Sequence, residues 1–199
     1  LERVCPRHGS ALALINSDRR HYYLRDEVPH AGLGKKCCCG AGPAHRTCIA
    51  LLELTEACNL ACPVCFAQSP RAGHGRYEDL CADLEAFLAA RGPLDVLQLS
   101  GGEPLLHPDL LRIVDHCQTL PIDHVMINTN GLALLANPTL AGELARRTPR
   151  LELSLQFDGL DRQCHVALRG ADLLERKQAV LATILEHKIP TTLVCTVVR

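Results

Sequence analysis

Apolar and polar positions follow a regular order from residue 47 to the end of the chain. Short apolar runs predict five β-strands, over 47–55, 94–99, 124–128, 151–157 and 192–198. Between these runs, apolar residues recur at helical spacing and predict four helices, over 77–91, 108–120, 138–147 and 172–187. An alternation of strand and helix is typical of parallel strands joined by right-handed crossovers.

This alternation indicates an α/β fold, and we expect a partial (β/α) TIM-like barrel of parallel strands. An open, doubly wound sheet has the same local pattern and is the alternative. A complete eight-stranded barrel takes about 250 residues, whereas the whole chain has 199. We therefore expect residues 47–199 to form the first five β/α units of a barrel that further residues complete.

The first 46 residues have a different character. They are rich in Cys, His, Gly and Pro, and they show no clear helix or strand period. Glycine-rich breaks occur at 31–34 and at 40–43. Because small regions without a large core are commonly held together by metal, we expect residues 1–46 to form a small, loop-rich, metal-binding region.

The composition narrows the range of partners. Apolar residues make up 47% of the chain, which is enough for a packed core. The 21 basic and 22 acidic residues nearly cancel, so we expect neither nucleic acid nor an anionic membrane surface as a partner. Aromatic residues amount to 3% and Trp is absent, which argues against a base-stacking surface. No apolar run approaches the ~20 residues that span a membrane, so we expect no transmembrane segment.

The 12 cysteines are the most unusual feature of the composition. Many of them are clustered, and adjacent cysteines suit a regular set of disulfides poorly. No signal peptide is visible, although the chain begins at Leu1 without Met, which leaves a removed leader open. We expect a cytoplasmic location, where a reducing environment lets thiolates bind metal.

The strongest chemical signal is the set Cys58, Cys62 and Cys65 in the stretch CNLACPVC, directly after the first predicted strand. In a β/α barrel this loop belongs to the face that carries active sites. Thiolates are the usual ligands of iron–sulfur clusters. Three ligands for four irons leave one iron open, as a catalytic zinc keeps one position open. The open iron can bind the amino and carboxylate groups of a small molecule.

Two other kinds of metal site fit the same cysteines less well. A structural zinc site would need a fourth ligand, for which Cys48 and Cys81 are the candidates. We expect Cys48 inside a strand and Cys81 on a helix, however. A ferredoxin-type electron carrier would need four cysteines.

The spacing of the three cysteines resembles that of the radical S-adenosylmethionine (SAM) superfamily. Further stretches match that family in order along the chain. They are Phe66 after the third cysteine, SGGEP at 100–104, TNG at 129–131, and the polar residues Ser154, Gln156, Asp158 and Arg169. Each short stretch is weak evidence alone, since Gly-Gly and Asn-Gly are common in turns. Their placement after successive predicted strands carries the resemblance.

The resemblance implies contacts to SAM from Phe66, Gly101, Gly102, Glu103, Asn130, Ser154, Gln156, Asp158 and Arg169. In the family, the aromatic packs beside the adenine and the GGEP segment contacts the SAM amino group, while polar residues after the fourth strand contact the ribose and methionine parts. A guanidinium at Arg169 can bind the SAM carboxylate with two hydrogen bonds, although a lone arginine is more often a solvated surface residue. Glu103 is either a SAM contact or a carboxylate that satisfies its own loop.

The chemistry implied by the resemblance is radical formation. In the family, a reduced [4Fe–4S] cluster passes one electron to SAM, and the resulting 5′-deoxyadenosyl radical abstracts hydrogen from a substrate. The expected partners are therefore a substrate and a reducing electron donor, while the protein orients the cofactor and excludes water. The alternatives are a non-catalytic iron–sulfur or zinc module for electron transfer, and a relative that keeps the cluster but has lost turnover.

A second metal site is expected in the first region. Its candidate ligands are Cys5, His8, Cys37 and one of Cys38 and Cys39, with Cys39 preferred. Cys/His sets of this kind bind zinc or an auxiliary iron–sulfur cluster. The alternative is a loop with incidental cysteines.

The order of these segments resembles one branch of the superfamily. That branch has an N-terminal CPxHG segment, a Cys/His knuckle and the sequence CNLxCPVCFA, and it includes archaeal dihydropterin methyltransferases and tetraether lipid synthases. The resemblance implies a small-molecule or lipid substrate, with methyl transfer or carbon–carbon bond formation on an unactivated carbon.

Overall fold

The computed structural model describes residues 49–65 and 73–197 in full, and residues 2–5 and 9–12 by their backbone. The chain divides into two compact units, Leu1–Ala41 and Gly42–Arg199. Each unit is described by itself.

The described part of the first unit is a β-hairpin. Strands β1 (Glu2–Cys5) and β2 (Gly9–Leu12) pair antiparallel, with Cys5 opposite Gly9. The sequence pattern does not predict this hairpin, because strands of four residues carry too little periodicity to detect. The expected ligands His8, Cys37 and Cys39 lie outside the described residues. The second metal site therefore remains a prediction.

The second unit is built on a parallel five-stranded sheet. Its strands are β3 (Ile49–Thr55), β4 (Leu94–Gly101), β5 (Ile122–Thr129), β6 (Leu151–Gln156) and β7 (Thr191–Val194). Hydrogen-bonded neighbours follow the order of the chain from β3 to β7. A doubly wound sheet reverses its strand order at one point. The partial barrel is therefore confirmed and the doubly wound alternative is wrong.

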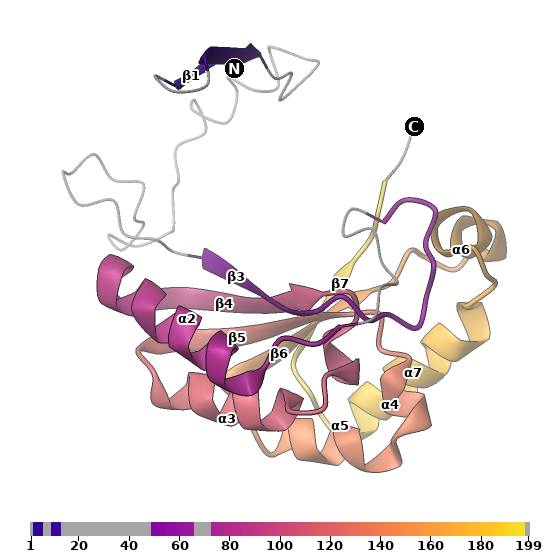
Figure 1. The fold of residues 1–199 in the computed structure, drawn as a ribbon. Helices are drawn as coiled ribbons and strands as arrows, with labels where there is room; N and C mark the ends of the chain where they lie inside the picture. Colours follow the sequence, from indigo (N-terminus) through magenta and orange to yellow (C-terminus); the bar gives the residue numbers. More distant parts are fainter. Residues whose placement is uncertain (1, 6–8, 13–48, 66–72, 198–199) are drawn as a thin grey trace, which may run out of the picture. The chain divides into compact units, whose positions relative to one another are not determined.

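Helices cover one face of this sheet. They are α2 (Tyr77–Arg91), α3 (Leu110–Thr119), α4 (Ala133–Ala136), α5 (Pro138–Ala145) and α7 (Leu174–Glu186), with a 3-10 turn η1 at Pro104–Leu106. Helix α6 (Arg162–Arg169) lies at the carboxyl ends of the strands (Figure 1). Figure 1 shows α3, α5 and α7 along the same side of the strands. None of the described helices has the length and apolar character that a membrane span requires.

The apolar core lies between the sheet and these helices. Alternate strand residues point to this side and are at most 1% exposed, as at Leu97, Leu99, Val125, Ile127 and Leu153. Full burial of one such side chain contributes about 1.5–3 kcal/mol. Burial of these alternate side chains therefore stabilises the predicted strands against the helices.

Polar side chains occupy the opposite face of the central strands. A cavity on this face is lined by Gln98, Ser100, Asn128, Ser154 and Gln156, together with Gly101, Gly102 and Val194. The interior of a complete β/α barrel is usually filled by bulky apolar side chains. The inner face of this sheet differs, because it presents hydrogen-bonding groups to the interior.

All nine strands and helices predicted from residue 47 onward are present in the second unit. The helix predicted over 77–91 has those bounds in the structure. Three short elements, η1, α4 and α6, are not predicted by the sequence pattern. Helix α6 matters most for the site, because it ends at Arg169.

Candidate metal and cofactor site

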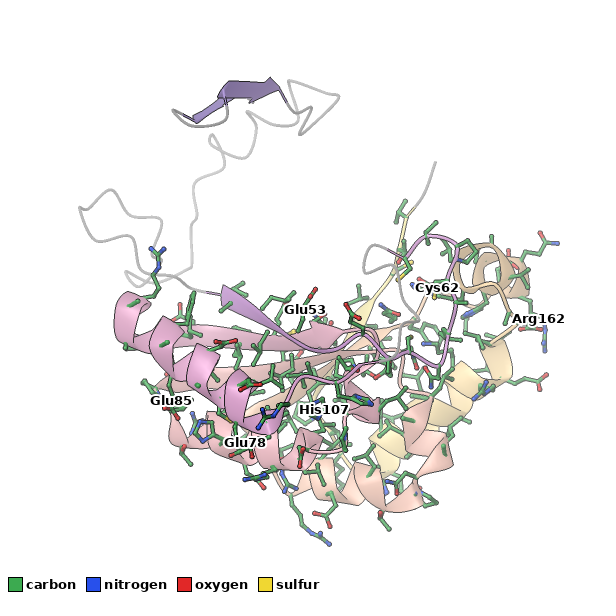
Figure 2. All side chains as sticks on the ribbon, in the orientation of Figure 1. Glu53, Cys62, Glu78, Glu85, His107 and Arg162 are labelled. Atoms are coloured by element: carbon green, nitrogen blue, oxygen red, sulfur yellow. The ribbon has the colours of Figure 1, made fainter. Side chains whose placement is uncertain are left out.

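The three predicted cysteine ligands follow β3 in one loop. Cys58, Cys62 and Cys65 are all partly buried and form no disulfide. The Cys65 amide donates to the Cys62 carbonyl over 3.2 Å, which folds the end of the loop into a turn. Burial raises the pKa of the Cys58 thiol, and the nearby Glu103 adds to this effect. Figure 2 shows Cys62 at the same end of the second unit as Arg162, the first residue of α6.

One cavity joins this loop to the carboxyl ends of the neighbouring strands. All three cysteines line it, together with Gly101, Gly102, Asn130, Gln156 and Arg169 among others. The structure therefore brings the predicted cluster ligands and five of the predicted SAM contacts to one place. Phe66 lies outside the described residues.

The set of donors in this cavity fits an iron–sulfur cluster. Among the described residues that line it, the metal-binding side chains are the three thiols, with no further Cys, His, Asp or Glu. Cys81 lies on α2, interacts with Tyr77 and does not line the cavity, which removes it as a fourth zinc ligand. Among the described residues, no three His, Cys, Asp or Glu side chains lie close enough together in this structure to hold a single metal ion. Three soft ligands match a cluster with one open iron better than tetrahedral zinc.

Gly101 and Gly102 bring β4 against the start of the cysteine loop. Gly101 has φ +127°, and a Cβ there would lie 2.2 Å from the Thr55 carbonyl oxygen. A Cβ on Gly102 would lie 2.3 Å from the Ala57 carbonyl oxygen. The Gly102 amide donates to the Thr55 carbonyl over 2.6 Å. Glycine is therefore required here by the close approach of two backbone segments, in addition to any contact with SAM.

Glu103 is buried, and both of its carboxylate oxygens are engaged within the protein. Oε1 accepts hydrogen bonds from the Thr129 hydroxyl at 2.6 Å and the Leu105 amide at 3.1 Å. Oε2 accepts from the Asn130 amide at 2.7 Å. Burial raises the pKa of this carboxyl, against the effect of these hydrogen bonds. Two of the three donors, the Thr129 hydroxyl and the Asn130 amide, lie at the end of β5, so Glu103 ties its loop to that strand end, and its contact with SAM stays a prediction.

Asn130 connects the end of β5 to the cysteine loop. Its Nδ2 donates to Asn59 Oδ1 over 2.7 Å, and its Oδ1 accepts from the Leu132 amide over 2.9 Å. Asn59 directly follows Cys58. The side chain of Asn130 thus orients the loop, while the residue also lines the cysteine cavity.

Ser154 and Gln156 lie at the carboxyl end of β6 and line the polar cavity described above. This polar cavity and the cysteine cavity share Gly101, Gly102, Asn128 and Gln156 as lining residues. The two cavities therefore adjoin along the strand ends. Their common wall is where the sequence predicts the SAM contacts.

Asp158 and Arg169, both predicted SAM contacts, form an ion pair with each other. Arg169 Nε lies 2.6 Å from Asp158 Oδ2, and Nη2 lies 2.7 Å from Oδ1. Burial alone would raise the pKa of Asp158, but hydrogen bonds from Arg169 and the Thr196 amide outweigh it and lower the pKa. The alternative of a solvated surface residue is wrong for Arg169, which is 6% exposed. The guanidinium edge formed by Nε and Nη2 is already occupied by Asp158.

Lys177 lies next to this site, and the sequence reasoning missed it, as it missed the lining residue Asn128. Lys177 is fully buried, and its Nζ donates to the carbonyls of Asn130 and Gln156, each over 2.6 Å. Burial, together with the charge of Arg169, lowers the pKa of Lys177 to about 8. The sequence did contain a sign of this burial. Lys177 falls at helical spacing from Leu173, Val180 and Ile184, which form the buried side of α7.

Comparison with known proteins agrees with this geometry. A family model described as "Radical SAM superfamily" matches residues 52–199. The chain is 29% identical over 196 residues to the 7,8-dihydro-6-hydroxymethylpterin dimethyltransferase of Methanocaldococcus jannaschii, covering 91% of the chain and 38% of that relative. It is 32% identical over 124 residues to the mycofactocin maturase MftC of Mycobacterium ulcerans, covering 60% of the chain and 31% of the maturase. The chain thus spans about a third of the length of these relatives.

Solved structures show the same fold. Streptococcus suis SuiB bound to the precursor peptide SuiA matches with a TM-score of 0.65 at 19% identity, over 77% of this chain and 34% of SuiB. Native anSMEcpe with bound AdoMet and a peptide matches with a TM-score of 0.58 at 23% identity, over 74% of this chain and 42% of anSMEcpe. The relatives are named as methyltransferase, maturase and cyclase, so the family is one of enzymes. The chain belongs to the radical SAM superfamily.

Proposed function

We propose that the protein binds a [4Fe–4S] cluster through Cys58, Cys62 and Cys65 and uses it to cleave SAM reductively. The observation that carries the proposal is the single cavity that joins the three thiols to the strand ends. The bound cluster and SAM would together supply the 5′-deoxyadenosyl radical that abstracts hydrogen from the substrate. An electron donor would supply the electron for this cleavage.

The chain's own residues supply binding and orientation. Arg169 interacts with the Cys62 thiol, which places its guanidinium beside the expected cluster. The glycine pair lets β4 lie against the cysteine loop. Ser154 and Gln156 offer hydrogen-bonding groups for the polar parts of SAM.

We propose further that the substrate is a small polar molecule rather than a lipid. The polar inner face, with Gln98, Ser100 and Asn128, supports this choice, because burying such groups against an alkyl chain would leave them without hydrogen bonds. The Methanocaldococcus jannaschii relative is named for methylation of a pterin, which is a polar heterocycle. Methyl transfer to a heterocycle of this kind is the reaction that we favour over lipid coupling.

The test is anaerobic reconstitution with iron and sulfide, followed by electron paramagnetic resonance of the reduced protein with and without SAM. We expect a [4Fe–4S] signal that changes when SAM is added. Cys62→Ala should abolish it, while Cys164→Ala, which alters an exposed cysteine of α6, should leave it intact. A cluster signal that does not change when SAM is added would favour the electron-transfer alternative. Full iron content in Cys62→Ala would overturn the assignment of Cys62 as a ligand.

The substrate class has its own test. Formation of 5′-deoxyadenosine and of methylated product would be followed with 6-hydroxymethyl-7,8-dihydropterin and, separately, with an isoprenoid diether lipid. We expect the pterin to stimulate turnover and the lipid to have no effect. Stimulation by the lipid alone would reverse the choice.

We also propose that Cys5, His8, Cys37 and Cys39 bind zinc or an auxiliary cluster in a reducing, cytoplasmic setting. Metal analysis of the natural protein and of Cys37→Ser tests this. An unchanged metal content in the variant would remove this residue from the set.

A further inference from the structure

Lys177 ties together two strand ends beside the cysteine cavity. Its side chain is fully shielded from solvent, and Nζ donates to the Asn130 and Gln156 carbonyls, each over 2.6 Å. Gln156 is the last residue of β6, and Asn130 directly follows β5. Lysine is almost never fully buried unless its charge is compensated. Its presence here therefore points to a role that an apolar residue could not fill.

Glu103 supplies the opposite charge on the other side of Asn130. The side chain is 1% exposed, and its Oε2 accepts the hydrogen bond of the Asn130 amide at 2.7 Å. The backbone of Asn130 is thus held by a carboxylate at its N–H and by an ammonium at its carbonyl. Hydrogen bonds to charged groups are roughly twice as strong as those between neutral groups.

The side chain of Asn130 carries this restraint to the cysteine loop. Its Nδ2 donates to Asn59 Oδ1 over 2.7 Å, and the Leu132 amide fixes the orientation of the Asn130 carboxamide. Asn59 lies between Cys58 and Cys62 in the chain. A continuous series of hydrogen bonds therefore runs from α7 to the loop that holds the expected cluster.

We propose that Lys177 is a positioning residue of the SAM site. Together with Glu103 it fixes Asn130 and the end of β6, and through Asn130 it sets the position of the cysteine loop relative to the SAM contacts. The lysine does not line the cysteine cavity, so it acts through Asn130 and Gln156. This inference rests on the proposed function for the identity of the ligand, SAM.

The first experiment compares SAM binding in three variants of the natural full-length protein, each reconstituted with its cluster. Lys177→Met removes the charge, Lys177→Arg keeps it, and Arg176→Met alters the exposed neighbouring cation on the same helix. We expect Lys177→Met to weaken SAM binding about tenfold or more, a loss of about 1.4 kcal/mol. Lys177→Arg should recover part of this loss, and Arg176→Met should bind SAM like the wild type.

A second experiment tests the charge pairing. Lys177→Met leaves the Glu103 carboxylate buried without its counter-charge, and adding Glu103→Gln removes that imbalance. The double variant should therefore lose less SAM affinity than the sum of the two single losses, as expected for coupled groups. Strictly additive losses, or normal SAM affinity in Lys177→Met, would overturn the inference.

A third measurement needs no cluster. Amide hydrogen exchange of the unloaded protein would be followed in peptides that cover 56–65 and 129–132. We expect exchange to be faster in Lys177→Met by about tenfold or more in both peptides, because local opening becomes easier. Unchanged protection at 56–65 would contradict the path through Asn59. If Lys177→Met fails to fold, Lys177→Gln would replace it in all three experiments, since glutamine keeps a hydrogen-bond donor and lacks the charge.

The two proposals fail in different ways. A wild-type protein that takes up no cluster or ignores SAM would overturn the proposed function. A wild-type protein that binds SAM, beside a Lys177→Met variant that binds it equally well, would overturn the positioning role alone.

Discussion

Arg169 and Asp158 form a buried, bidentate ion pair at the edge of the cysteine cavity. Nε lies 2.6 Å from Oδ2 and Nη2 lies 2.7 Å from Oδ1, and Nη2 also donates to the Thr196 hydroxyl over 2.9 Å. The resemblance to the family implies a contact with SAM for each of these residues. In this structure the two side chains bind each other instead. The pair joins the end of α6 to the segments that follow β6 and β7. Its first role is to hold these segments together beside the expected cluster.

Replacing Arg169 with Ala should cost stability as well as SAM affinity. The change leaves the Asp158 carboxylate buried without its partner, and breaking a buried ion pair in this way costs about 3–5 kcal/mol. Urea unfolding of the unloaded protein measures the first effect, and SAM titration of the reconstituted protein measures the second.

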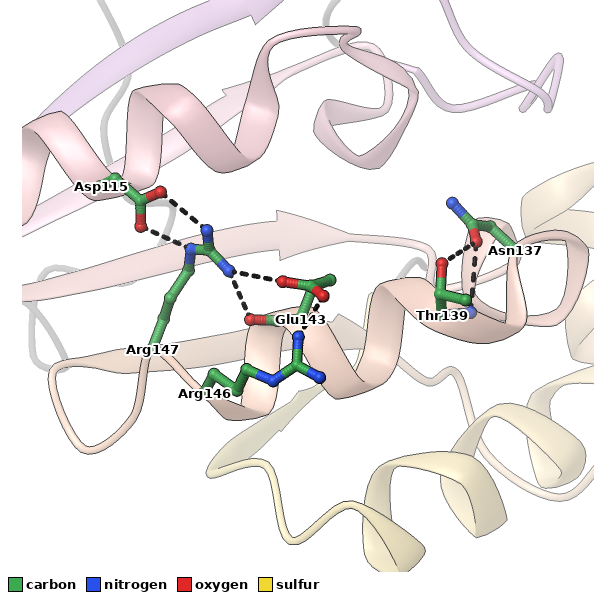
Figure 3. A network of polar contacts seen from close by, with 6 residues as sticks. All are labelled: Asp115, Asn137, Thr139, Glu143, Arg146 and Arg147. Carbon is green, nitrogen blue, oxygen red and sulfur yellow. Dashed lines mark hydrogen bonds and ion pairs between the residues drawn. The ribbon is translucent and has the colours of Figure 1, made fainter.

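Arg147→Ala is the matched control for this prediction. Arg147 also binds a carboxylate through Nε and Nη2, that of Asp115, and its Nη1 contacts Glu143, but these two carboxylate partners are 55% and 36% exposed (Figure 3). Exposed pairs contribute about 0.2–1 kcal/mol, so this variant should lose little stability and no SAM affinity. Equal losses of stability in the two variants would show that the buried Arg169–Asp158 pair stabilises the fold no more than the exposed pair does.

Gly102→Ala should prevent cluster uptake. An added Cβ would lie 2.3 Å from the Ala57 carbonyl oxygen, so the backbone at the start of the cysteine loop must move. Overpacking of this kind costs about 1–3 kcal/mol, and the displaced loop should hold less iron after reconstitution. Gly142→Ala is the control, because Gly142, like Gly102, has no positive φ, and an added Cβ there would meet no atom closer than 3.8 Å. Full iron content in Gly102→Ala would show that the loop tolerates the shift.

Most of the fold was predictable from the sequence, and the reason is physical. Strand and helix positions follow from the period of apolar residues, and that period is a local property of the chain. The period of apolar residues does not by itself separate a barrel from a doubly wound sheet, because that difference depends on which strands become neighbours, and the strand order confirmed the expected barrel. Helix α6 was missed because its eight residues carry few apolar positions.

The candidate site was predictable in its residue types and less so in its contacts. The cysteine spacing predicted the loop at the strand ends, and all three cysteines line one cavity there. The partners of Glu103 and Asp158 could not be foreseen, since each lies on a separate segment of the chain. The buried Lys177 had a visible signal, a charged residue at an apolar position of the helical period.

The stability contributed by Lys177 should depend on pH in the alkaline range. Its pKa is about 8 in the folded protein and 10.5 in an unperturbed chain, so between these values the unfolded state holds a proton that the folded state has lost. The free energy of unfolding of the wild type, relative to Lys177→Met, should therefore rise with pH over this window, by at most about 1.4 kcal/mol per pH unit. It should be flat below pH 8.

Charged groups around Lys177 set the size of this effect. Arg169 lowers the pKa of Lys177, while Glu103, Asp158 and Cys62 raise it against the effect of burial. Subtracting the pH dependence of Lys177→Met removes the titration of other groups to first order. A difference that stays constant from pH 7 to pH 10 would mean that the lysine keeps an ordinary pKa.

The polar inner face should control substrate binding separately from SAM cleavage. Asn128 Nδ2 donates to Gln98 Oε1 over 3.5 Å and Gln98 Nε2 donates to the Met126 sulfur over 3.6 Å. Both hydrogen bonds are long, so the carboxamides can exchange them for contacts with a ligand. Gln98→Leu should therefore weaken the stimulation of 5′-deoxyadenosine formation by a dihydropterin, by about tenfold or more if it removes about 1.4 kcal/mol of binding. SAM binding should change less, because Gln98 lines the polar cavity and not the cysteine cavity. Gln178→Leu, at an exposed position on α7, is the matched control. If Gln98→Leu lowered SAM affinity as much as it lowered the response to the pterin, the polar face would belong to the SAM site, and the argument for a polar substrate would lose its support.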